Sequence, residues 1–482
     1  MAGTGDWVTE TDRGRVRGLV RDGVASFRGV PYAASPVGEL RLAPPRRHPG
    51  WTGVREVVSA GPAVPQGPSR LERVMGRRAP DWDEGGCLTV NVHAPAGALE
   101  ADELRPVLLW WHGGGFSSGS GGWDWYDGAR LAALGGIVVV TANYRLGPLG
   151  YPYLPEADAV NLGARDQAAV LRWVRDNIAL FGGDPRRVTV GGQSAGAYSA
   201  LALALDPGTA GMVRQVLLQS GPFGLPPQDP EQAAEVTAAY LRILGVREGA
   251  DPVKALRAQP VEHLLSAYAR LVGRLARPGD ATPPMYPVLG GPGIPDDLLA
   301  AVARGGLGDR PLLIGTTRDE ATAFTAFDPG LRGLTADGAV ESLEPPYGAR
   351  AREVYQRYAG PRPGATPAQV LTAVRTDGLF RTGSLRVADH HAAAGNAVYA
   401  YRFDRRPADD AYGLGATHCG ELPFLFGTFD AYPDSPMLGT PTEADRVLGR
   451  AFAAAVAEFV TTGAVGDWRP YEPDGTFVRH FG

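Results

Sequence analysis

The segment from Val188 to Leu205 constrains the fold of this chain more than any other. A short apolar run, Val188–Val190, leads into Gly192-Gln193-Ser194-Ala195-Gly196, and an Ala/Leu-rich stretch continues to about Leu205. This order predicts a strand, a tight turn and a helix. The two glycines give the turn the room that it needs to expose the serine oxygen.

The alternation of strands and helices extends over much of the chain. Leu162–Phe181 carries apolar residues at helical spacing and is followed by Gly182-Gly183, a helix stop signal. Together these segments predict an α/β fold with a mostly parallel sheet that helices cover on both faces. The further predicted strands are Val107–Trp111, Ile137–Ala142, Val216–Leu218, Leu312–Ile314 and Val398–Phe403.

The organisation predicted from the sequence is one domain over residues 1–482. The first ninety residues read as short strands and turns, with a hairpin around Asp22-Gly23. Gly61–Gly86 is rich in Pro, Gly and Arg, which predicts a surface loop. Residues 226–395, apart from Leu312–Ile314, read as helices and loops inserted over one edge of the sheet.

Composition and charge narrow the range of functions that this chain can have. The net charge of −5 argues against nucleic acid as a partner. No apolar run is long enough for a membrane span, and Met1–Arg15 lacks the apolar core of a secretory signal. Cys87 and Cys419 are too few for a disulfide framework or a structural zinc site, so we expect a cytoplasmic protein without a metal. We expect a monomer or a weak homo-oligomer.

Two motifs carry the chemistry expected of acyl transfer. Ser194 is a candidate nucleophile, which needs a base to remove its proton. His112-Gly113-Gly114-Gly115-Phe116 follows a predicted buried strand, and its glycines allow backbone N–H groups to approach a developing oxyanion. We assign Gly114, Gly115 and Ala195 as the oxyanion donors, and His112 as a residue that orients this loop.

The base and the acid are less sharply defined by pattern. Among eight histidines, His418 is favoured because it lies in a turn-rich segment after the predicted strand Val398–Phe403. Asp319 and Glu320 follow another strand, at the end where α/β sheets place catalytic groups. On chemistry alone, either carboxylate could orient the imidazole.

The chain resembles the type-B carboxylesterase/lipase family, which includes bacterial p-nitrobenzyl esterases and cholinesterases. The resemblance runs from Gly14 to the C-terminus. It is carried by Phe27–Ala33, His112–Phe116, Tyr126–Gly128, Asn143–Gly147, Phe181–Pro185, Gly192–Gly196, Gln219–Gly221, Ile314–Glu320 and Gly415–Gly427. It implies an α/β-hydrolase fold, no cofactor and a triad of Ser194, Glu320 and His418, with Glu320 chosen because glutamate is the usual acid of the family.

Two positions depart from the family pattern. Gln193 stands where the family usually has Glu, which removes a carboxylate but no member of the triad, so we expect activity to survive. Gly85-Gly86 replaces an acidic pair before Cys87. The resemblance implies that one of those acids pairs with the arginine of Phe-Arg-Gly, so Arg28 is expected to lack its partner.

The predicted function is hydrolysis of small-molecule carboxylic esters with small to medium acyl groups, through an acyl-enzyme intermediate. The candidate pocket walls are Phe116, Trp123, Trp125, Tyr126, Phe223 and Phe327. Asp81, Asp83 and Glu84 are candidates to attract a cation near the entrance, but a solvated loop is the favoured interpretation. Three alternatives stay open: an enzyme that transfers or cyclises acyl groups in biosynthesis, an amidase or carbamate hydrolase, and a non-catalytic binding homologue.

Overall fold

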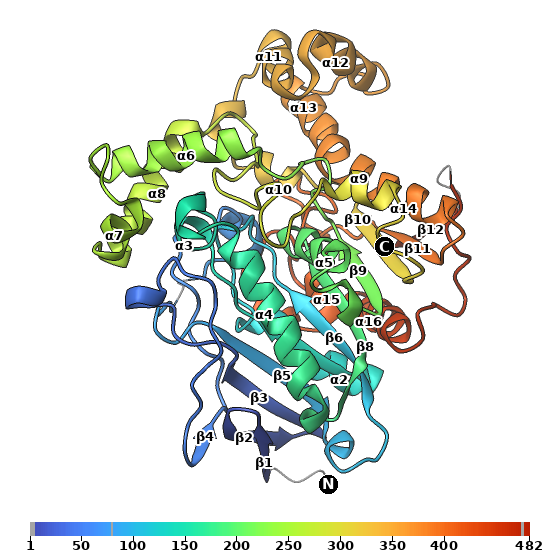
Figure 1. Cartoon of the computed structure of the whole chain (residues 1–482). Coiled ribbons are helices and arrows are strands. Elements are labelled where there is room, and N and C mark those ends of the chain that lie inside the picture. The colour runs from blue at the N-terminus through green and yellow to red at the C-terminus, as the bar shows by residue number, and fades with distance from the viewer. Residues whose placement is uncertain (1–4, 79–80, 474–476) are drawn as a thin grey trace.

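The computed structural model describes residues 5–78, 81–473 and 477–482, so the first four residues of the predicted domain lie outside it. Within these residues, twelve strands form one mixed sheet (Figure 1). The order is β1-β2-β3-β5-β7-β6-β8-β9-β10-β11-β12, and β4 pairs with β2. The strands are β1 (Gly5–Thr11), β2 (Gly14–Arg21), β3 (Val24–Pro31), β4 (Val54–Glu56), β5 (Thr89–Pro95), β6 (Arg105–Trp111), β7 (Val138–Ala142), β8 (Gly183–Gln193), β9 (Gln215–Gln219), β10 (Leu312–Thr317), β11 (Val398–Phe403) and β12 (Val478–Phe481).

The sheet changes character along its width. From β7 to β12 neighbouring strands are parallel, as the α/β prediction requires. The pairs β1–β2, β2–β3, β3–β5 and β5–β7 are antiparallel, and the short β4 pairs with β2 in parallel. Strands β2 and β3 form the predicted hairpin around Asp22-Gly23. The fold is therefore the α/β-hydrolase fold that the sequence predicted, with an antiparallel extension built by the first ninety-five residues.

Strand β6 shows how both faces of the sheet are buried. Leu108 and Trp110 pack into one apolar cluster, with side chains of α2 (Ala129–Gly135), α15 (Leu422–Phe426) and α16 (Glu443–Thr462). Leu109 and Trp111 point to the opposite face and pack with α4 (Leu162–Asn177) and α5 (Ala195–Leu205). Alternate residues thus serve two cores, which explains why β6 is apolar along its whole length.

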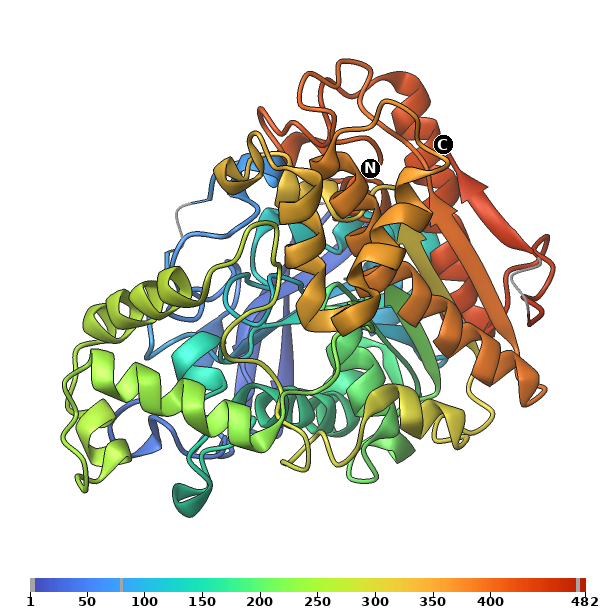
Figure 2. The ribbon, with the colours of Figure 1, turned by 90° about the horizontal axis from the view of Figure 1, so that it is seen from above.

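The residues from 226 to 395 supply a group of helices beside the sheet. Figure 1 draws α11, α12 and α13 together above the strands and α6 beside α8 at the left, and Figure 2 shows both groups from above. Asp229 caps α6 through the N–H groups of Glu231 and Gln232, and Pro230 starts it. The helices are α6 (Pro230–Ile243), α7 (Pro252–Arg257), α8 (Val261–Leu275), α9 (Leu298–Ala303), α10 (Thr322–Thr325), α11 (Ala336–Tyr347), α12 (Ala351–Ala359), α13 (Pro367–Arg375) and α14 (Thr382–Ala393).

The segment Gly61–Gly86 is only partly the surface loop that its composition predicted. Its residues 63–66 are buried, and Gln66 bonds the backbone of Gly119 in both directions. A short helix, α1 (Glu72–Met75), follows and buries Val74 and Met75. Specific contacts therefore hold this Pro-rich segment against the body of the molecule.

None of the helices in the described part of the chain has the length and apolarity needed to cross a lipid bilayer. The same residues contain no cluster of His, Cys, Asp and Glu side chains suited to a metal ion.

Candidate active site

Ser194 occupies a strained turn between β8 and α5. Its φ of 58° and ψ of −125° are unusual for a residue with a side chain, and Ser194 N donates to Gln219 O at 2.9 Å. A Cβ atom on Gly196 would lie 2.0 Å from Trp111 O, and one on Gly192 would lie 2.4 Å from the Gly196 backbone. Only glycine fits at either position, so the local sequence forces the sharp turn that projects the serine.

The glycine loop after β6 lies against this turn. A Cβ on Gly113 would approach the Ser194 Cβ to 3.1 Å, and Gly114 and Gly115 have positive φ angles of 112° and 59°. Gly114, Gly115 and Ala195 line one cavity with Ser194. Their backbone N–H groups have no hydrogen-bond partner among the described residues. Unpaired N–H groups at the wall of the cavity that holds Ser194 are suited to bind an anionic oxygen.

His112, at the start of this loop, contacts the loop itself. Its Nδ1 lies 2.8 Å from Gly113 O, and its ring stacks on Tyr144 with centroids 4.5 Å apart. Burial lowers the pKa of His112 to about 4, which keeps the imidazole neutral near pH 7. These contacts suit the orienting role expected for it.

His418 and Glu320 form a fully buried pair. His418 Nδ1 lies 2.5 Å from Glu320 Oε2, and Glu320 Oε1 accepts from Thr317 N at 2.8 Å. The imidazole contacts the rings of Phe324 and Phe380, with centroid distances of 5.4 and 4.7 Å. The carboxylate therefore fixes the ring through Nδ1, and Nε2 faces the other way.

Asp319, the other candidate acid, connects the two loops that carry this pair. Asp319 Oδ2 accepts from Ala416 N at 2.9 Å, Asp319 N donates to Ala416 O at 2.8 Å, and the carboxylate pairs with Arg318. Thr322 Oγ1 adds a bond of 2.7 Å to Thr417 Oγ1. Neighbouring carboxylates thus differ in position: Glu320 reaches the imidazole, and Asp319 joins the loop after β10 to the segment after β11.

Gln193 contacts the other ring nitrogen. Its Nε2 lies 3.2 Å from His418 Nε2, while the Ser194 hydroxyl has no hydrogen bond among the described residues. With Nδ1–H donated to Glu320, the Nε2 lone pair is free to accept from the amide. Sequence reasoning treated Gln193 only as the loss of a carboxylate and did not anticipate this contact.

The cavity beside Ser194 has a volume of about 50 Å³. Of the six predicted wall residues, Phe116 lines it, and the other five do not. Trp125 instead stacks on Tyr432, Tyr126 packs against Phe426, Trp123 packs against Trp125, and Phe327 packs against Tyr412. The walls that sequence reasoning missed are Ser69, Arg70, Leu71, Ser118, Pro222, Leu225, Ala281, Thr282, Pro283, Phe324, Leu379 and Phe380.

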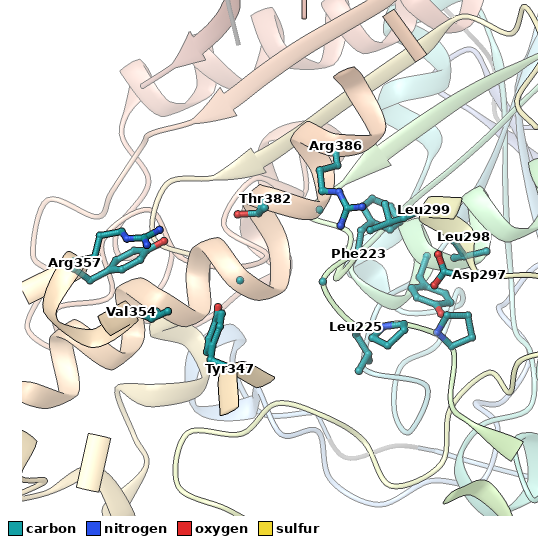
Figure 3. Close-up of a pocket in the computed structure, with 17 residues that line it drawn as sticks. Phe223, Leu225, Asp297, Leu298, Leu299, Tyr347, Val354, Arg357, Thr382 and Arg386 are labelled. Atoms are coloured by element: carbon teal, nitrogen blue, oxygen red, sulfur yellow. The ribbon is translucent and has the colours of Figure 1, made fainter. Parts of the chain in front are cut away.

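Phe223 lines a second, larger pocket of about 490 Å³ (Figure 3). Figure 3 shows Phe223 beside Arg386 of α14, with Tyr347 and Val354 of α11 and α12 across the pocket. Leu225 belongs to the walls of both cavities. This side chain therefore lies where the two spaces adjoin.

The departures from the family pattern have local consequences. Arg28 donates to Val58 O at 2.7 Å and pairs with no carboxylate among the described residues, as expected. Glu84, expected to be solvated, is buried and pairs with Arg41 at 2.6 Å. Cys87 and Cys419 are buried free thiols, and burial raises the pKa of each, which makes them poor nucleophiles.

Ser194 lies in a strained turn after a parallel strand, with unpaired backbone donors beside it. The loops that follow carry a buried histidine–carboxylate pair. This arrangement is typical of hydrolases of the α/β-hydrolase class. The comparisons with known proteins narrow this class. Residues 6–479 match the model of the carboxylesterase family. The chain belongs to that family and is a serine hydrolase of carboxylic esters.

Similar proteins span nearly the whole chain. A phenmedipham hydrolase from Pseudarthrobacter oxydans is 38% identical over 463 residues, covering 95% of this chain and 90% of the relative. A para-nitrobenzyl esterase from Bacillus subtilis is 37% identical over 431 residues, which cover 88% of this chain and 83% of the relative. The crystal structure of the Geobacillus stearothermophilus carboxylesterase EST55 at pH 6.2 matches with a TM-score of 0.85 and 34% identity. The match covers 98% of this chain and 96% of the EST55 chain.

Proposed function

We propose that this protein hydrolyses small carboxylic esters through an acyl-enzyme formed on Ser194, with His418 as base and Glu320 as the acid that orients it. The observation that carries this proposal is the cavity in which Ser194 meets three backbone N–H groups without partners. The proposed oxyanion donors are Gly114, Gly115 and Ala195. Losing one such donor typically costs about 3 to 4 kcal/mol of transition-state stabilisation.

The proposed reaction has two halves. His418 Nε2 takes the Ser194 proton as the serine oxygen attacks the ester carbonyl, and the proton then passes to the departing alcohol. Water then attacks the acyl carbon while His418 Nε2 takes its proton. His418 returns this proton to Ser194 Oγ as the bond between the serine oxygen and the acyl carbon breaks, which releases the acid and restores the enzyme. For the first step the Gln193 amide has to give up its contact with His418 Nε2, because this nitrogen must accept the serine proton.

Substrate size follows from the cavity. Its volume of about 50 Å³ and its apolar walls, among them Phe116, Leu225 and Phe380, favour small to medium acyl groups. We also propose that residues 226–395 cap the site within a single domain, since Leu225, Ala281–Pro283 and Phe324 contribute walls from that region or its border.

We also propose a cellular location, an oligomeric state and a range of partners for this protein. Two free, buried cysteines fit a cytoplasmic protein. The net charge of −5 fits a protein that binds no nucleic acid, and we propose a monomer or weak homo-oligomer that does not associate with membranes.

Substitution of the serine tests the proposal. In Ser194→Ala, turnover of p-nitrophenyl butyrate should fall on the order of a million-fold, and labelling by a fluorophosphonate should disappear. Ser266→Ala, on the exposed face of α8, is the matched control and should retain both. A Ser194→Ala protein that is folded and keeps a large fraction of turnover would exclude Ser194 as nucleophile. A wild type that is neither labelled nor active would support a binding homologue.

A further inference from the structure

The cavity that holds Ser194 is lined by charge of one sign only. Of the seventeen residues that line it, Arg70 is the only one with a charged side chain, and no Asp or Glu lines it. Arg70 belongs to the segment 61–86, directly before α1. A permanent positive charge therefore stands at the wall of an otherwise uncharged cavity.

The guanidinium is held in place without being neutralised. Arg70 Nη2 donates to Asp280 O at 2.8 Å, and Nη1 donates to Ala281 O at 3.0 Å. These partners are backbone carbonyls, and Arg70 forms no ion pair with a carboxylate of the described residues. Arginine has more N–H donors than these two bonds use, so further donors stay open to a ligand.

The carboxylate that acts on Arg70 forms no hydrogen bond with it. The Asp280 carboxylate acts on Arg70 at longer range, and its Oδ1 accepts from Thr282 N. It also acts on Arg375, whose Nη2 bonds Pro278 O. Asp280 thus acts on two guanidinium groups, and Asp328 also acts on Arg375. Burial lowers the pKa of Arg70, but arginine stays protonated at any pH at which the enzyme works.

Arg70 is exposed to solvent at the cavity wall, and two more deeply buried arginines differ from it in their partners. Arg145 is bidentate with Asp166, and Arg41 is bidentate with Glu84. Arg310 resembles Arg70 in bonding only backbone carbonyls, but it does not line the cavity at Ser194, whereas Arg70 does. A guanidinium with open donors is well suited to bind a carboxylate through a bidentate pair of hydrogen bonds.

We infer that Arg70 selects esters that carry a second, anionic group, of which half-esters of short dicarboxylic acids are the simplest class. This inference rests on the proposed function, because Ser194 must supply the chemistry. The ester carbonyl lies at Ser194, and the free carboxylate at the far end of the acyl chain lies at Arg70. Hydrolysis then releases the alcohol and a dicarboxylic acid.

Two p-nitrophenyl esters of similar length test the inference. The hydrogen glutarate ester carries a carboxylate, and the pentanoate ester is neutral. In Arg70→Gln, kcat/KM for the glutarate ester should fall about 10- to 100-fold, mainly through KM, with the pentanoate ester changing about twofold or less. Arg70→Lys should be intermediate, and added 0.5 M NaCl should weaken the preference of the wild type.

The controls separate this inference from the proposed function. Arg77→Gln removes the same charge from the same segment, at an exposed arginine outside the cavity, and should leave both esters unchanged. Equal losses on both esters in Arg70→Gln would mean that Arg70 only holds residues 280–281, and an unchanged glutarate rate would also overturn the inference. Either result leaves Ser194 in place if Ser194→Ala still abolishes both reactions.

Discussion

At the scale of single residues, Gln193 contacts the ring nitrogen with which the proposed base acts. It stands immediately before Ser194, and its amide nitrogen lies 3.2 Å from His418 Nε2. A neutral amide at this position adds no charge to the imidazole and stays compatible with the neutral ring that must accept the serine proton. The identity of this side chain therefore bears on the pH range over which the enzyme works.

Gln193→Glu should narrow that range on the acidic side. A carboxylate beside Nε2 stabilises the protonated imidazole, which cannot act as a base, so the acidic limb of the kcat/KM profile should move up by about one pH unit. The measurement is the pH–rate profile with p-nitrophenyl butyrate. Gln369→Glu, an exposed residue at the start of α13, makes the same charge change. A Gln193→Glu profile that overlays the wild type would contradict the expectation.

At the scale of elements, the ends of the parallel strands assemble the site. The glycine loop follows β6, Ser194 follows β8, Glu320 follows β10, and His418 lies in the segment after β11. All four strands lie in the parallel part of the sheet, and their carboxyl ends meet at one edge. The helical region then adds walls, and Leu225 lines both the small cavity and the larger one.

Leu225→Ala should widen the range of acyl chains. Removing this side chain joins the cavity of about 50 Å³ to its neighbour of about 490 Å³, which gives a longer chain a place to lie. On p-nitrophenyl acetate, butyrate, hexanoate and octanoate, we expect the octanoate-to-butyrate ratio of kcat/KM to rise about tenfold, as burial of a few methylene groups allows.

Leu299→Ala is the control, because Leu299 lines only the larger pocket. It should leave the chain-length ratio close to that of the wild type. If Leu225→Ala also leaves the ratio unchanged, the two spaces do not join during turnover.

At the scale of the whole molecule, a buried carboxyl outside the proposed triad affects stability. Glu421 lies three residues after His418 and is fully buried; Oε1 accepts from Ser220 Oγ at 3.4 Å, and Oε2 has no partner among the described residues. Burial, and then the neighbouring Glu320 carboxylate, raise the pKa of Glu421 to about 8. The folded protein therefore holds a proton there at neutral pH, which the unfolded chain releases.

Because of this proton, the free energy of unfolding decreases as pH rises. Above the ordinary glutamate pKa of about 4.5 the unfolded chain has lost the proton, and the folded state keeps it until about pH 8. Stability from this group is fully present below that range and declines through it by up to about 1.4 kcal/mol per pH unit. Glu421→Gln keeps the shape without the titration, so the variant should lose less stability with rising pH.

Denaturant unfolding at pH 5.5 and 7.5 measures the difference. Between these pH values the wild type should lose on the order of 2 kcal/mol more than Glu421→Gln. Glu248→Gln, at an exposed glutamate, controls for the removal of a carboxylate. Equal losses in wild type and Glu421→Gln would show that Glu421 is ionised in the folded protein.

The sequence determined the parts of this protein that depend on local pattern. Apolar runs ending in glycine predicted β6 and β8, since a buried strand must be apolar and a tight turn after it needs residues without a side chain. The same patterns, with the family resemblance, predicted the α/β-hydrolase fold and the carboxylesterase family, both of which are confirmed. They also gave Ser194, Glu320 and His418 as candidates, whose roles stay proposals.

Only the tertiary structure decided which side chains surround Ser194. Trp125 and Tyr126 were reasonable wall residues by type, but they pack against Tyr432 and Phe426. Arg70 comes from a segment without periodic pattern, and Phe380 lies almost two hundred residues after Ser194. Cavity walls are assembled from loops that are distant in sequence, and nothing in local composition specifies which loops meet, because packing of the whole chain sets that contact.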